Sequence, residues 1–169
     1  MVSETARSLG IAVISMGDII REEADARRIV KTPSSLGNLM LQLRKEKGEH
    51  VVAKRCLEKI MNHPGIVLIE GIRSIDEVNF FKENSKVCLI AVHASPKTRF
   101  DRLIKRDRPD DPKEWKTFYE RDMRELGVGL GVVIALADKL FINEGTVAEI
   151  SDTVKSFFEG IIDGSKSDC

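Results

Sequence analysis

The chain has 169 residues, with 27 basic and 27 acidic side chains that cancel to a net charge of zero. This length fits one domain with a real core, and 42% hydrophobic residues is typical of a globular protein rather than a disordered one. Balanced charge argues against a general nucleic-acid or membrane-surface binder, since either shows a basic excess. No apolar run reaches ~18 residues, so no membrane-spanning helix is predicted.

The cysteines are Cys56, Cys88 and Cys169. An odd count without metal-ligand spacing indicates a reduced protein of the cytoplasm, with two packed thiols and one on the tail. The start, which includes Glu4 and Arg7, does not read as a signal peptide. The small, polar tail over 163–169 is predicted to fray.

The pattern along the chain predicts an α/β fold. Residues 1–10 read as the end of a helix, and residues 19–62 read as helical, with Gly48 dividing them into two helices. Four apolar runs read as strands: 11–16, 66–69, 87–92 and 139–142. They lack period-two alternation, as expected for a parallel sheet covered on both faces.

Capping residues predict where the later helices begin. The signals are Ser74 with Glu77, Ser95 with Pro96, Asp111 with Pro112, and Thr146 with Glu149. The stretch 105–115 is nearly all charged and contains two prolines. It is typical of a solvated surface loop or of a mobile lid, and both can be true.

The first candidate site is the segment 15–21, where a strand ends in Gly17, Asp18 and, one helical turn on, Arg21. Ligands of open parallel sheets bind beyond the carboxyl ends of the strands. Gly17 allows close approach of the backbone, Asp18 suits a metal ion or an acceptor hydroxyl, and Arg21 suits a phosphate. An N-capping Asp18 with a solvated Arg21 is an equally good interpretation.

The second candidate site repeats this pattern, because the strand 66–69 ends in Glu70, Gly71 and Arg73. A carboxylate here suits the outer shell of a magnesium ion, which keeps most of its waters. Two strand ends that each offer a carboxylate and an arginine suit a phosphorylated acceptor.

An arginine set follows: Arg99, Arg102, Arg106, Arg108, Arg121 and Arg124. Phosphoryl transfer spreads negative charge over the moving group, so arginine clamps are its main catalytic device. Ordinary charged helices with acidic partners explain most of this set. Arg106, Arg121 and Arg124, which flank the predicted lid, are the candidates for catalysis.

The turn 141–146 lies at the same predicted sheet edge and contains Asn143, Gly145 and Thr146. It suits contact with a purine ring through backbone groups, and a plain turn with a helix cap explains it equally well. A glycine run at 127–131 follows a helix rather than a strand, so it indicates a helix end and not a dinucleotide site.

These segments resemble those of adenylate kinases and, in the second half, of dephospho-CoA kinase. Residues 15–21 are similar to the Ser/Thr-Gly-Asp turn with its following arginine, and residues 70–73 to the Asp-Gly-Phe-Pro-Arg turn, shorter by one residue. Residues 47–52 resemble the stretch lining the monophosphate's base, which places Val52 there. As a whole, the chain most closely resembles a largely archaeal family of adenylate-kinase-related P-loop nucleotide kinases.

The resemblance implies a single three-layer P-loop kinase domain over 1–169, with an acceptor-binding helical region at about 19–62 and a lid at about 105–120. It implies transfer from ATP, with Mg²⁺, to a nucleotide-like small molecule by a monomer or homodimer. Arg21 and Arg73 would hold the acceptor phosphate, and the three arginines flanking the lid would close over the donor. The segment 143–146 would sit near the ATP base.

One departure from the family stands out, because no Gly-x-x-x-x-Gly-Lys-Ser/Thr loop occurs in the 169 residues. In the resembled fold this loop follows a first, central strand. Without that strand, the strand 66–69 is separated from the strand 87–92 and two apolar strands are left without a partner. We therefore expect an N-terminally truncated sequence that lacks kinase activity. The alternative is a non-catalytic protein that binds a nucleotide such as AMP. An RNA-linked NTPase is disfavoured by the neutral charge.

Overall fold

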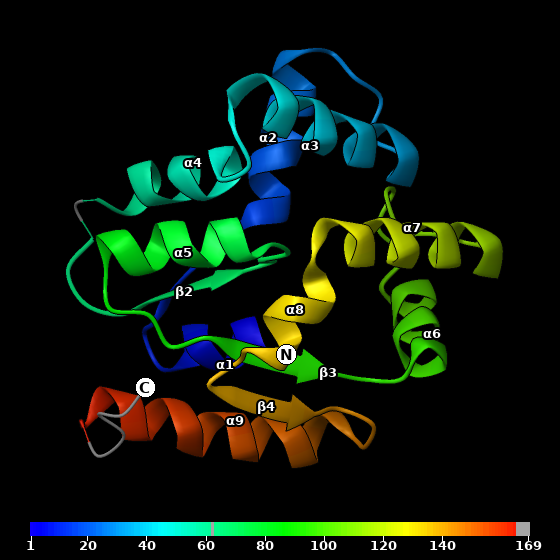
Figure 1. The fold of residues 1–169 in the computed structure, drawn as a ribbon. Coiled ribbons are helices and arrows are strands. Elements are labelled where there is room, and N and C mark those ends of the chain that lie inside the picture. Colours follow the sequence, from blue (N-terminus) through cyan, green and yellow to red (C-terminus); the bar gives the residue numbers. More distant parts are fainter. Residues whose placement is uncertain (62, 165–169) are drawn as a thin grey trace.

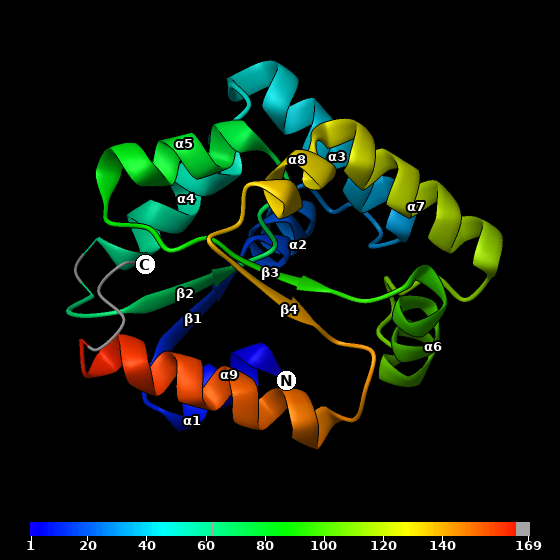
Figure 2. The same cartoon turned by 60° about the horizontal axis from the view of Figure 1, so that its bottom comes forward.

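The strands lie in two parallel pairs. The computed structural model describes residues 1–61 and 63–164, with the side chain of residue 147 left undescribed. The strands are β1 (Ala12–Ser15), β2 (Val67–Glu70), β3 (Ile90–His93) and β4 (Lys139–Ile142). Ser15 of β1 lies opposite Glu70 of β2, and His93 of β3 lies opposite Ile142 of β4. Figure 2 shows β1 beside β2 and, apart from them, β3 beside β4.

The described strands form no single continuous sheet, and the separation of the strand 66–69 from the strand 87–92 is the one expected for a chain without a central strand, whereas the expected cover on both faces is incomplete. Among the described strands, β2 and β3 share no ladder, and each strand has one partner. Phe141 is 5% exposed and packs against Phe157, whereas Leu140 and Ile142 on the opposite face of β4 are 48% and 59% exposed. A strand residue is buried only where another layer covers its face, and β4 is covered on one face.

Helices connect all the strands. They are α1 (Val2–Ser8), α2 (Met16–Ala26), α3 (Pro33–Lys47), α4 (Val51–Ile60), α5 (Ile75–Asn84), α6 (Pro96–Arg106), α7 (Trp115–Val128), α8 (Leu130–Ala135) and α9 (Val147–Ile162). Figure 1 shows α2 to α5 above the strands and α9 below them, and Figure 2 shows α1 beside α9. Among the described helices, none is both long and apolar enough to cross a membrane.

The region expected to hold two helices holds three. Gly48 ends α3, as predicted, but a second break separates α2 from α3. Thr32 caps α3 by accepting a hydrogen bond from the Ser35 amide, and Pro33 occupies the first helical position. Proline disfavours helical backbone at the residue before it, which explains the break.

Three of the four predicted helix starts are confirmed, at Ser74, Ser95 and Thr146. The start predicted at Asp111 is wrong, because α7 begins after Glu114. Asp111 instead accepts hydrogen bonds from Arg106 and from the backbone of Arg108, so its carboxylate is not free to cap a helix.

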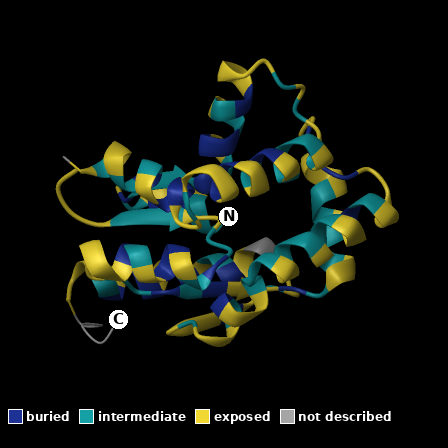
Figure 3. Cartoon of the chain, turned by 45° about the horizontal axis from the view of Figure 1, so that its top comes forward, coloured by how far each residue is buried: buried dark blue, intermediate teal, exposed yellow. Residues whose placement is uncertain are grey.

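Two main clusters of buried side chains hold these layers together. The larger lies among α2, α3 and α4 and includes Met16, Leu43 and the free thiol of Cys56. The other lies between α1 and α9 and includes Ala6 and Val154. Figure 3 shows the outer helix faces exposed and the inner faces buried. The predicted fraying of the tail, and the place of Cys169, concern residues 165–169, outside the described residues.

Candidate functional site: an arginine cluster at the ends of β1 and β2

The carboxyl ends of β1 and β2 bring the two predicted glycine turns into contact. A methyl group placed on Gly71 would lie 3.6 Å from the Met16 Cβ and 3.8 Å from the Gly17 nitrogen. Gly71 has φ +95°, a left-handed conformation that glycine adopts without strain. Gly71 therefore approaches the first turn of α2, which contains Gly17, and Arg21 and Arg73 each follow this contact by a few residues.

Arg21, on α2, is held between two carboxylates. Its Nη1 donates to Asp18 and its Nη2 to Asp110, each at 2.7 Å. Burial alone would lower the pKa of Arg21, but the bonds to Asp110 and Asp18 raise it. Asp18 lies within α2 rather than at its cap, which is Ser15, so the N-capping interpretation does not hold.

Arg73 follows β2 and reaches toward α7. Its Nη1 donates to the Gly71 carbonyl at 2.5 Å, and its Nη2 lies 3.2 Å from Glu125 Oε1. The same Glu125 oxygen accepts from Arg121 Nε at 3.1 Å. Burial would raise the pKa of Glu125, but the charges of Arg73 and Arg121 outweigh it and hold the pKa below its usual value.

The charged segment between α6 and α7 is anchored rather than fully solvated. Asp110 and Asp111 are 6% and 2% exposed. Asp111 accepts from Arg106 Nε at 2.9 Å and from the Arg108 amide at 3.0 Å. Burial would raise the pKa of both aspartates, but Arg21 lowers that of Asp110 and Arg106 lowers that of Asp111.

These contacts define what we call the arginine cluster: Arg21, Arg73, Arg106 and Arg121, with Asp110, Asp111 and Glu125. The charged groups of different helices and loops also influence one another electrostatically. The charge of Arg121 lowers the pKa of Asp111, and Asp110 raises that of Arg106. Guanidinium forks that donate to carboxylate oxygens have a geometry that also suits donation to phosphate oxygens.

Several predicted residues lie outside this cluster. Arg124 donates to the Pro33 carbonyl at 3.0 Å and packs against Gly37 of α3, so it ties α7 to α3. Val52 is 3% exposed inside the larger core cluster. Glu70 accepts a hydrogen bond from the Ser3 hydroxyl. Within the described residues, His, Cys, Asp and Glu side chains form no group of three able to hold a metal ion.

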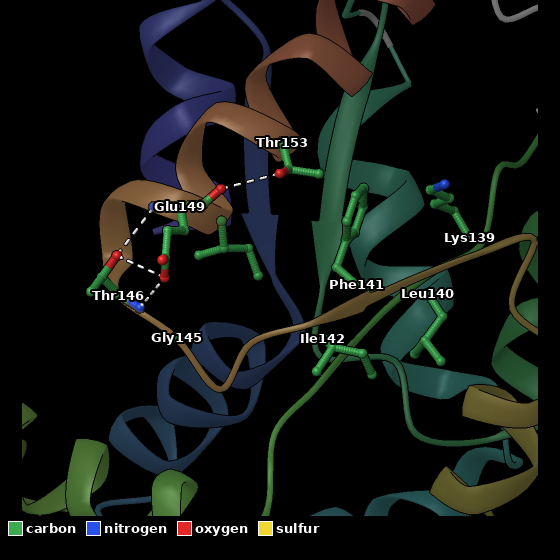
Figure 4. A pocket seen from close by; sticks show the side chains of 9 residues that line it. Lys139, Leu140, Phe141, Ile142, Gly145, Thr146, Glu149 and Thr153 are labelled. Carbon is green, nitrogen blue, oxygen red and sulfur yellow. Dashed lines mark hydrogen bonds between the residues drawn. The ribbon is translucent and has the colours of Figure 1, made fainter.

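The turn between β4 and α9 is held by Arg102 of α6. The Arg102 guanidinium donates to the carbonyls of Asn143 at 2.7 Å and Gly145 at 3.1 Å. The Asn143 Oδ1 is buried and accepts no hydrogen bond from the described residues. Gly145 and Thr146 line a cavity of about 340 Å³ between β4 and the first turns of α9 (Figure 4).

Sequence reasoning missed Asp110, Glu125 and Arg102 as members of these networks. The adjacent Asp110 and Asp111, placed just after two arginines of the predicted lid, were the available sign of paired charges. Glu125 lies four residues after Arg121, a helical spacing that the sequence did offer. Its contact with Arg73, and those of Arg102 with the β4–α9 turn, join residues far apart in the sequence and depend on the fold.

The comparisons place the chain in a P-loop family related to nucleotide kinases. Residues 1–118 match the family model described as AAA domain, and the chain belongs to this family. It belongs more narrowly with the UPF0200 proteins. One, from Hyperthermus butylicus, is 49% identical over 92% of this chain and 84% of its own length. Another, from Methanocaldococcus jannaschii, is 41% identical over 94% of this chain and 82% of its own length.

Proposed function

We propose that this protein transfers a phosphoryl group from ATP, with Mg²⁺, to a nucleotide-like acceptor. The observation that carries the proposal is the arginine cluster, which gathers guanidinium groups from α2, the β2–α5 turn, α6 and α7 at the carboxyl ends of two parallel strands. Phosphoryl transfer needs positioning and charge stabilisation more than covalent chemistry from the protein, and guanidinium forks supply both.

The roles follow from position. Arg21 on α2 and Arg73 in the β2–α5 turn, each just beyond the end of its strand, would hold the acceptor phosphate. Arg106 and Arg121 flank the lid segment and would stabilise the charge on the transferring group. Asp18, 61% exposed beside Arg21, would orient the acceptor hydroxyl or a metal-bound water.

The remaining groups of the proposal serve the donor. Glu70, at the end of β2, would belong to the outer shell of Mg²⁺, where a carboxylate binds through metal-bound water. Asn143, Gly145 and Thr146 would face the ATP base from the β4–α9 turn. Arg124, which binds α3 rather than the cluster, would act only by holding α7 in place.

The donor phosphates need a loop that these 169 residues do not contain. In the described residues, β2 and β3 each use one edge for pairing and leave the other edge unpaired. Buried backbone groups without partners cost about 1–3 kcal/mol each, against a total stability of about 5–15 kcal/mol. We therefore propose that a central strand carrying the phosphate loop pairs with both edges in the native protein.

Measuring the intact mass of the protein from its own cells tests whether the native chain contains this strand. An excess of roughly fifteen residues, the length of a strand with its loop, would support the proposal. A mass equal to 169 residues would refute it. It would favour instead a protein that binds a nucleotide such as AMP without transferring phosphate.

Binding of AMP tests the acceptor site. Replacing Arg73 with alanine removes charge-assisted hydrogen bonds worth about 1.5–3 kcal/mol, so the Kd for AMP should rise roughly 10- to 150-fold by calorimetry. Adenosine, which has no phosphate, should bind both proteins equally. Arg7→Ala, an exposed site on α1, is the matched control.

The acceptor itself is open among AMP, another nucleoside monophosphate and a pantetheine nucleotide such as dephospho-CoA. Transfer of label from γ-labelled ATP to each of these, catalysed by the protein isolated from its own cells, identifies the substrate. If Arg73→Ala leaves the affinity for every one of them unchanged, the acceptor site is not where we propose. If all bind and none is labelled, binding without catalysis is the function.

A further inference from the structure

A buried ion pair joins the helical region to the turn that carries Arg73. Arg44 on α3 and Glu77 on α5 are 4% and 2% exposed, and Arg44 Nη2 lies 2.5 Å from Glu77 Oε1. Of the ion pairs between described residues, none has both partners as deeply buried. Burying two charges costs several kcal/mol per ion, and apolar replacements of such pairs are often as stable.

The pair is also incompletely satisfied. The Arg44 Nε is buried and donates to no described residue. An ion pair that served stability alone would have all of its buried donors hydrogen-bonded, because each unpaired buried polar group lowers the stability. The Arg44–Glu77 pair leaves one donor unpaired. The second oxygen of Glu77 indicates what the pair does instead.

Glu77 Oε2 holds the backbone of Arg73 itself. It accepts from the Arg73 amide at 2.8 Å and from the Ser74 amide at 3.2 Å. A capping box requires only the bond to Ser74, the residue that caps α5. The shorter bond to Arg73 goes beyond helix capping and fixes the residue whose guanidinium enters the arginine cluster.

The same turn is packed from its other side by the junction between α7 and α8. A methyl group on Gly129 would lie 3.7 Å from the Arg73 carbonyl oxygen and 3.8 Å from the Ser74 Cα. The Arg73 backbone is thus enclosed between a carboxylate on its amide side and Gly129 on its carbonyl side. Arg44 connects this arrangement to α3, whose first turn is held by Arg124 of α7.

We propose that Arg44 and Glu77 are positioning residues, which set the Arg73 backbone so that its side chain meets the acceptor phosphate. The carboxylate of Glu77 fixes the amide, and Arg44 fixes the carboxylate. The inference rests on the proposed function, in which Arg73 binds that phosphate. Neither Arg44 nor Glu77 touches the ligand, so both act through Arg73.

A double-mutant cycle with AMP as the probe tests the proposal. Glu77→Gln keeps the shape of the side chain and removes its charge. By calorimetry, we expect it to raise the Kd for AMP about tenfold with Arg73 present, and to leave it unchanged in the Arg73→Ala background, because residues acting as a unit are non-additive. Adenosine affinity should not change in any variant.

The matched control is Glu23→Gln. Glu23, 16% exposed on α2, also pairs with an arginine of another helix, Arg55 of α4, and it does not contact the Arg73 turn. If Glu77→Gln does not fold, the variant Arg44→Met/Glu77→Gln takes its place, since it leaves no buried charge unpaired. The melting curve of each variant establishes that it is folded.

The outcomes separate the two proposals. If Arg73→Ala leaves AMP binding unchanged, the proposed acceptor site fails. If Arg73→Ala weakens AMP binding but the Glu77 variant does not, or weakens it equally in both backgrounds, the positioning role fails. The wild-type protein gives an independent measurement: the Arg73 amide hydrogen should exchange as slowly as amides of the core, and rapid exchange would refute its fixation by Glu77.

Discussion

Removing the Asp111 carboxylate should release the segment between α6 and α7. The Asp111 side chain is 0% exposed and accepts hydrogen bonds from Arg106 and from the Arg108 amide. Hydrogen bonds to charged groups contribute about 1.5–3 kcal/mol each. Arg106 is 40% exposed, so solvent screens its share. If each bond to Asp111 contributes near the lower end of this range, Asp111→Ala should lower the free energy needed to open the segment between α6 and α7 by about 2–3 kcal/mol.

Limited trypsin digestion measures this opening, because Lys113 is exposed within the segment and precedes Glu114. When opening is fast relative to cleavage, the rate follows the population of the open form, so 2–3 kcal/mol corresponds to a roughly 30- to 150-fold faster cut. Asp101→Ala, an exposed site on α6, should be cut like the wild type. Equal rates for Asp111→Ala and wild type would show that the carboxylate does not anchor the segment.

Two further predictions concern pH and thiol chemistry. Burial would raise the pKa values of Asp110, Asp111 and Glu125, yet the neighbouring arginines hold them below their usual range. The stability that these ion pairs add is fully present above the unfolded-state pKa of about 4 and is lost as the pH falls through the lower pKa values of the folded state. The urea concentration at the unfolding midpoint should therefore drop in acid. A midpoint that rises in acid would contradict the pairing. Burial raises the pKa of the Cys56 thiol to about 12. Iodoacetamide should therefore label the Cys56 peptide in guanidinium chloride but not in the native protein near neutral pH, and native labelling at the unfolded rate would contradict its burial.

Local sequence chemistry predicted the parts of the fold that depend on neighbouring residues. The capping boxes at Ser74 and Thr146 form as expected because both partners lie within one helical turn. Asp111 failed as a helix start because it has a stronger partner, the guanidinium of Arg106, which local pattern does not weigh against a cap. The break before Pro33 was available from the sequence and was missed.

In the candidate site too, local sequence predicted some features and others depend on tertiary packing. The repeated pattern of glycine and arginine at two strand ends predicts that Arg21 and Arg73 face one crevice, since carboxyl ends of parallel strands share an edge. What these arginines bind depends on distant segments: Asp110 lies 89 residues from Arg21 in the sequence. Partners at such separations are set by tertiary packing alone, which also explains why Arg124 binds the Pro33 carbonyl of α3 rather than the lid.

The division of the strands into two pairs has a consequence for how the domain holds together. Within the described residues no backbone ladder crosses from β2 to β3. What crosses is side-chain packing: Val13 and Leu68 of one pair meet Phe141 of the other in the cluster beneath α9. The helix α9 therefore covers both strand pairs, and the two halves are joined by apolar packing and by side-chain bonds such as Arg21 with Asp110 rather than by a backbone ladder.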